Sequence, residues 1–179
     1  LQAGRRTSAL ATLNLGIGGN GVLHDFTGPN ALARFDRDVL GQAGVRYMIL
    51  MEGINDINRA AKPRSPAEVI SVEDLIAGYR QLIARAHNAG IKVIGATAKS
   101  MTPFAGSHSA TPEGEAIRDQ LNAFIRTSLL FDGVIDFARV MADPADPLRY
   151  DPRALSPDHL HPGDPGYVMM GEAIDLELF

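Results

Sequence analysis

Asp158 and His161 are the residues whose types and spacing point most directly to catalysis, in the run Asp158-His159-Leu160-His161-Pro162. An aspartate and a histidine three residues apart in a loop can form a hydrogen bond. In such a pair the carboxylate orients the imidazole, which acts as a general base. The two histidines could instead belong to a zinc site, but the remaining ligands would have to come from distant acids or other histidines. The sequence favours the general base, which needs a nucleophile.

A glycine-rich segment near the N-terminus, residues 14–21, has the spacing G-x-G-x-x-G beginning at Gly16. This spacing is typical of a dinucleotide-binding turn, but such a turn opens directly into a helix, and the run Thr27-Gly28-Pro29 prevents that here. The glycines could serve only to make a tight turn. A glycine also lets a backbone N–H face a developing oxyanion without obstruction, which is a catalytic use of the same freedom.

Asn55 and Asp56 lie in a polar run that directly follows the apolar stretch Val45 to Met51. Asparagine and aspartate in loops often do no more than cap turns. At the carboxyl end of a buried strand, however, an asparagine amide can point into a site and donate a hydrogen bond to an oxyanion. Asn55 is therefore a candidate for that role.

These three segments together resemble the second, third and fifth sequence blocks of the SGNH (GDSL-type) hydrolases, in the order of the family. The resemblance implies that Gly19 and Asn55 form an oxyanion hole and that Asp158 and His161 are catalytic, while His159 fills a variable position. It implies a serine esterase that forms an acyl-enzyme on carboxylic esters without a metal or an organic cofactor.

The family's first block, a G-D-S motif that carries the nucleophilic serine, should precede Asn14 by some tens of residues, but only thirteen residues are present there. Ser8 lacks the G-D-S context and is interpreted as a surface or helix-end serine. We therefore expect residues 1–179 to be a single, N-terminally incomplete SGNH hydrolase domain whose serine lies upstream. The alternative is a noncatalytic binding module of the same fold. A buried Asp–His pair argues against that alternative, because desolvating such a pair is costly without a task.

Short apolar runs alternate with longer periodic ones, which predicts an α/β fold with a parallel sheet covered by helices on both faces. The expected strands are Ala11 to Leu15, Val45 to Met51, Ile91 to Ala96 and Gly133 to Phe137. The expected helices are Asn30 to Leu40, Val72 to Asn88, Pro112 to Ser128 and Pro165 to Leu176. The resemblance adds a three-layer α/β/α sandwich of flavodoxin-like topology. Its central first strand would be missing from this chain, which leaves two unpaired strand edges.

The composition excludes several partners. With 17 basic and 21 acidic residues, the net charge is −4 and the signs are interspersed, so nucleic acid is not expected to bind. No apolar run reaches the roughly 18 residues that span a bilayer. Cysteine is absent, which leaves the redox compartment open and is compatible with secretion. The expected partner is a small-molecule ester or an acylated carbohydrate, and the polar loop Ala105 to Ser109 favours a small or carbohydrate-borne acyl group.

Overall fold

The computed structural model describes residues 7–61, 63, 65–99, 111–158 and 160–179. Its sheet has three parallel strands, β1 (Tyr47–Leu50), β2 (Lys92–Ala96) and β3 (Gly133–Ile135), in the order β1-β2-β3. In the register, Tyr47 faces Lys92 and Ile94 faces Gly133. Parallel neighbours need long crossover connections, and helices supply them here. The predicted α/β class with a parallel sheet is confirmed.

Two long helices form these crossovers, α3 (Val72–Asn88) between β1 and β2, and α4 (Pro112–Thr127) between β2 and β3. The predicted bounds of α3 are confirmed. The helix begins at Val72 because Ser71 and Asp74 form a reciprocal capping box there. The other helical elements are α1 (Ala31–Phe35), which continues into the π-helical turn η1 (Asp36–Leu40), α2 (Ile54–Ala61), η2 (Pro66–Glu68), α5 (Phe137–Val140), α6 (Asp164–Glu172) and η3 (Leu176–Leu178).

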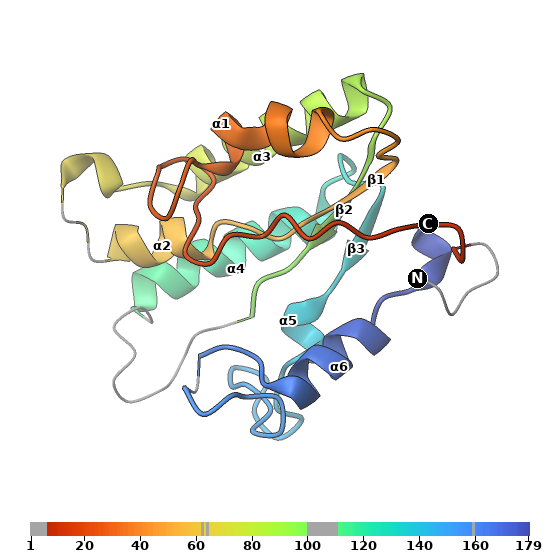
Figure 1. Ribbon diagram of the computed structural model, residues 1–179. Helices are drawn as coiled ribbons and strands as arrows, with labels where there is room; N and C mark the ends of the chain where they lie inside the picture. The colour runs from red at the N-terminus through yellow and green to blue at the C-terminus, as the bar shows by residue number, and fades with distance from the viewer. Residues whose placement is uncertain (1–6, 62, 64, 100–110, 159) are drawn as a thin grey trace.

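The two faces of the sheet are covered by different elements (Figure 1). One face packs against α1, α3 and α4 around a core that includes Val93 and Ile125. A Cβ at Gly95 would lie 2.8 Å from Phe131, so the centre of β2 approaches this layer closely. The opposite face, which includes Ile94, packs against α6 and the C-terminal segment. Since side chains alternate along a strand, this division gives the expected three layers.

The predicted strand Ala11 to Leu15 is not a strand in the structure. The segment runs as a coil outside the three arrows of the sheet (red in Figure 1), and it forms no ladder with any described strand. The apolar pattern alone could not decide this, because a strand also needs a partner for its backbone N–H and C=O groups. Among the residues that the structure describes, the sheet ends at β1, and Leu13 remains 60% exposed.

Within the described part of the chain, no helix has both the length and the apolar character needed to cross a bilayer.

Candidate active site

The loop before α6 holds Asp158 and His161 in contact. The Nδ1 atom of His161 lies 2.7 Å from Oδ2 of Asp158. The other carboxylate oxygen accepts the backbone N–H groups of Leu160 at 2.9 Å and of His161 at 3.0 Å, together with the Ser156 hydroxyl. These hydrogen bonds, that of Ser156 first, hold the pKa of Asp158 far below its usual range. A carboxylate that stays charged orients the imidazole with Nε2 facing away, as a general base requires. His159 lies outside the described residues.

The aspartate–histidine pair is exposed, contrary to the expectation of a buried pair. The side chains of Asp158 and His161 are 52% and 67% exposed. Solvent screens such a pair, so it adds little to the stability of the fold. Contrary to the prediction from the sequence, desolvation therefore does not make this pair costly to keep, and what the pair provides is orientation.

Gly19 lies in a tight turn in which the Asn20 N–H donates to the carbonyl oxygen of Ile17 at 3.1 Å. The φ angle of Gly19 is +76°, and a Cβ at this position would lie 2.7 Å from Oγ1 of Thr27. Both observations explain why a glycine stands here. Gly19 is exposed, and no hydrogen bond between described residues uses its N–H. That N–H can therefore serve a ligand.

Asn55 lies in the first turn of α2, directly after β1, and not in the loop that the sequence suggested. Its side-chain Nδ2 donates to the carbonyl oxygen of Asn20 at 2.8 Å. The structure thus brings Asn55 to the residue that follows Gly19. Since an amide NH₂ group carries two donors, one can hold this turn while the second serves an oxyanion.

The neighbouring Asp56 anchors the chain just beyond the turn. Its buried carboxylate accepts the N–H groups of Val22 at 2.7 Å and Leu23 at 3.0 Å. Burial raises the pKa of Asp56, and the two backbone hydrogen bonds oppose that shift. The run Gly53-Ile54-Asn55-Asp56 therefore holds residues 20–23 through two adjacent side chains, Asn55 and Asp56.

Sequence reasoning missed a largely buried polar cluster next to this turn, which includes Arg34, Glu52 and Tyr79. The Tyr79 hydroxyl donates to the carbonyl oxygen of Glu52 at 2.8 Å and accepts the Glu52 N–H at 3.2 Å. Burial raises the pKa of the Glu52 carboxyl to about 7. The available signal was Arg34, a charge between the apolar residues Ala31 and Phe35 in a predicted helix.

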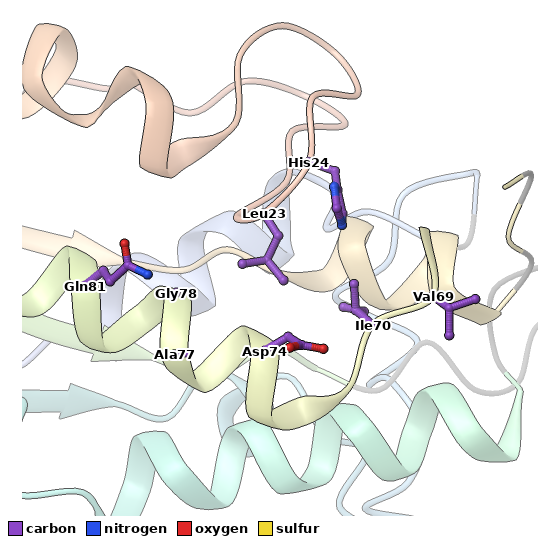
Figure 2. Close-up of a pocket in the computed structure, with 8 residues that line it drawn as sticks. All are labelled: Leu23, His24, Val69, Ile70, Asp74, Ala77, Gly78 and Gln81. Atoms are coloured by element: carbon purple, nitrogen blue, oxygen red, sulfur yellow. The ribbon is translucent and has the colours of Figure 1, made fainter. Parts of the chain in front are cut away.

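Figure 2 shows an open hollow beside α3, with a volume of about 380 Å³, that contains none of the four predicted site residues. It is lined by Leu23, His24, Val69, Ile70, Asp74, Ala77, Gly78 and Gln81. Leu23 and His24, which follow the Gly19 turn in the sequence, line this hollow. The convergence of Gly19, Asn55 and His161 on one reacting atom remains a prediction.

Solved structures with the same fold include a GDSL-like lipase from Bacteroides thetaiotaomicron, with 19% identity, a TM-score of 0.65, and coverage of 82% of this chain and 68% of that chain. An acetylxylan esterase from Geobacillus stearothermophilus matches at 20% identity and a TM-score of 0.65, over 96% of this chain and 74% of that chain. No curated protein sequence matches the chain. The model of the GDSL-like Lipase/Acylhydrolase family matches residues 2–169, nearly the whole length. The chain belongs to the GDSL-like lipase/acylhydrolase family.

Proposed function

We propose that this chain supplies the base and the oxyanion hole of a serine esterase that cleaves small acyl esters, with acetylated carbohydrates as the favoured substrates. The observation that carries the proposal is the 2.7 Å contact between His161 and Asp158. It is supported by the hydrogen bond from Asn55 to the turn that presents Gly19. One of the structural neighbours is an acetylxylan esterase, which agrees with a carbohydrate ester. The loop Ala105 to Ser109, from which the sequence predicts a small or carbohydrate-borne acyl group, lies outside the described residues.

The proposed reaction gives each of these residues one role. His161 takes the proton from the serine hydroxyl as its oxygen bonds to the ester carbonyl carbon, and Asp158 stabilises the resulting imidazolium. The Gly19 N–H and the Asn55 amide stabilise the oxyanion. His161 then returns the proton to the departing alcohol as the ester bond breaks. In the second half, His161 deprotonates a water that attacks the acyl carbon, and the serine regains its proton as the acid leaves.

The nucleophilic serine, in this proposal, lies on a strand upstream of residue 1 that docks between Ala11–Leu15 and β1. Apolar side chains on both sides support this. Leu13 is 60% and Ile49 44% exposed, and Leu15 and Met51 are exposed as well. An inserted strand would cover them and pair with the open edge of β1. Ser156 is a poor alternative nucleophile because its hydroxyl donates to Asp158, which makes it a support for the carboxylate.

The proposal is tested by expressing residues 1–179 alone and together with the coding segment upstream. We expect p-nitrophenyl acetate hydrolysis only from the longer protein, with acetate esters preferred over decanoate and acetate released from acetylated xylo-oligosaccharides. The longer protein should also unfold more cooperatively, since one strand supplies both the nucleophile and the missing pairing.

Two results would contradict it. Enzyme-like turnover by residues 1–179 that is abolished by Ser8→Ala would place the nucleophile inside this chain. A longer protein that folds and binds acetylated xylo-oligosaccharides without cleaving them would be a binding module.

A further inference from the structure

Arg34 is a buried cation that contacts several segments around the Gly19 turn. It lies on α1, and its side chain is only 8% exposed. Nη1 donates to the carbonyl oxygen of Leu15 at 2.7 Å and to Asp38 at 3.0 Å, and Nη2 donates to Glu52 at 3.3 Å. A guanidinium presents its donors in a fixed planar fork, so these acceptors are held at fixed positions relative to one another. Arg34 thus ties the start of the glycine-rich segment to the end of β1.

The fourth contact of Arg34 reaches the turn itself. Its Nε donates to Oδ1 of Asn20 at 3.0 Å. The Nδ2 of the same fully buried asparagine donates to the carbonyl oxygens of Thr27 at 3.0 Å and Pro29 at 2.9 Å. The backbone carbonyl of Asn20 accepts the Asn55 amide. Arg34 is therefore one residue removed from both oxyanion donors, through Asn20.

A second arginine in the same helical layer, Arg85, makes contacts that connect two helices and do not involve the site. Arg85 of α3 donates to the carbonyl oxygen of Leu32 at 2.8 Å and to Asp36 at 2.8 Å, and its guanidinium lies 4.7 Å from the ring centroid of Phe35. These contacts fasten α3 to α1 and its continuation η1. They do not include a residue of the Gly19 turn, so Arg85 is a matched control.

We propose that Arg34 is a positioning residue. By holding Asn20 through a hydrogen bond, it orients the Gly19 N–H and the Asn55 amide toward the oxyanion. The proposal rests on the proposed esterase function. A buried cation with several charged and carbonyl partners is costly to assemble unless its geometry is well satisfied, and here each of its nitrogens has an acceptor. An oxyanion hole requires donors held to within a fraction of an ångström, which such a fork provides.

The first test uses Arg34→Lys and Arg85→Lys in the protein that carries the serine strand. Lysine keeps the charge but cannot form the four contacts. We expect Arg34→Lys to lower kcat for p-nitrophenyl acetate by about 10- to 100-fold with KM changed less than about threefold, because the loss falls on the transition state. Arg85→Lys should keep kcat. An unchanged kcat in Arg34→Lys, or equal losses of kcat in the two variants, would overturn the proposal.

The second test applies if the Arg34→Lys variant fails to fold. Asn20→Asp has the same shape, but it sets a carboxylate oxygen against the carbonyls of Thr27 and Pro29 and should shift the turn. The kcat of Asn20→Asp should fall about as far as that of Arg34→Lys. A folded Asn20→Asp protein with the kcat of the wild type would overturn the proposal.

The third test needs no activity, so it separates this inference from the proposed function. Amide hydrogen exchange is measured for Asn20, Val22 and Leu23, whose N–H groups are hydrogen-bonded. We expect faster exchange of these amides in Arg34→Lys or Asn20→Asp than in Arg85→Lys. If the wild type proves inactive, the esterase proposal fails while this comparison still decides the role of Arg34. Unchanged exchange would overturn that role.

Discussion

The side-chain amide of Asn55 donates to the backbone carbonyl of Asn20 at 2.8 Å, across 35 positions of sequence. This bond joins the first turn of α2 to the turn that presents Gly19, so the two expected oxyanion donors belong to one hydrogen-bonded unit. A change at either residue should therefore affect both donors.

Asn55→Asp replaces the donor NH₂ with a carboxylate oxygen that repels both the Asn20 carbonyl and an oxyanion. We expect kcat for p-nitrophenyl acetate in the serine-bearing protein to fall by about 100- to 1000-fold, which is the usual cost of losing one oxyanion donor. The exposed Asn88→Asp at the end of α3 introduces the same chemical change away from the site and should retain kcat. Retention of activity by Asn55→Asp would remove Asn55 from the proposed mechanism.

Gly19→Ala and Gly44→Ala form a matched pair, because both glycines have φ +76°. A new Cβ at Gly44 meets nothing within 4 Å, whereas at Gly19 it lies 2.7 Å from Thr27 Oγ1. Each variant should lose roughly 1–2 kcal/mol of unfolding free energy from the left-handed backbone. Only Gly19→Ala should also lose esterase activity, because its turn must move. Urea unfolding and kcat measured on both proteins separate the two effects, and equal activities would contradict the assigned role of Gly19.

Asp158→Asn should lower kcat by about 1000- to 10,000-fold, because the amide no longer selects the imidazole tautomer that a general base needs. Its melting temperature should stay close to that of the wild type, since both members of the pair are largely exposed. The depressed pKa of Asp158 means that the carboxylate stays ionised from mildly acidic pH upward, so its own titration should not limit activity there. A large loss of stability without a loss of kcat would indicate a structural role.

Glu52→Gln tests the carboxyl whose pKa burial raises from 4.5 to about 7. With a raised pKa, the folded protein binds more protons than the unfolded chain between about pH 4.5 and 7. The free energy of unfolding therefore falls as pH rises through this window, by at most about 3 kcal/mol. Glutamine keeps an oxygen for Arg34 but does not titrate. Urea unfolding at several pH values should show a steeper decline in the wild type than in Glu52→Gln, with the exposed Glu113→Gln as control. An equal decline of the unfolding free energy with pH in the wild type and in Glu52→Gln would contradict the raised pKa of Glu52.

The elements predicted best are those whose signals are local. Both ends of α3 follow from neighbouring residues, Ser71 at the start and Gly90, with φ +73°, after the end. The start of α4 follows from the Thr111-Pro112 pair in the same way. The pair Asp158 and His161 was found because its partners are three residues apart.

The missed features depend on residues far apart in sequence. Helix α2 contains asparagine and aspartate, which favour turns, and it is held by the bonds of Asp56 to Val22 and Leu23. Burial of Arg34 depends on acceptors such as Glu52, 18 positions away. The prediction of a strand at Ala11 to Leu15 was wrong because pairing is a property of two strands and cannot be read from the apolar pattern of one.

The Tyr79 hydroxyl, which bonds both the N–H and the C=O of Glu52, has a consequence for where β1 stops. These two backbone groups would continue the ladder with β2 in a longer strand, but a single phenol from α3 occupies both. The chain thereby leaves the sheet just after Leu50 with both backbone groups of Glu52 hydrogen-bonded, and α2 can begin at Ile54. A core tyrosine in the helical layer thus contributes to the length of β1, and with it to the point in the chain at which α2 and Asn55 follow.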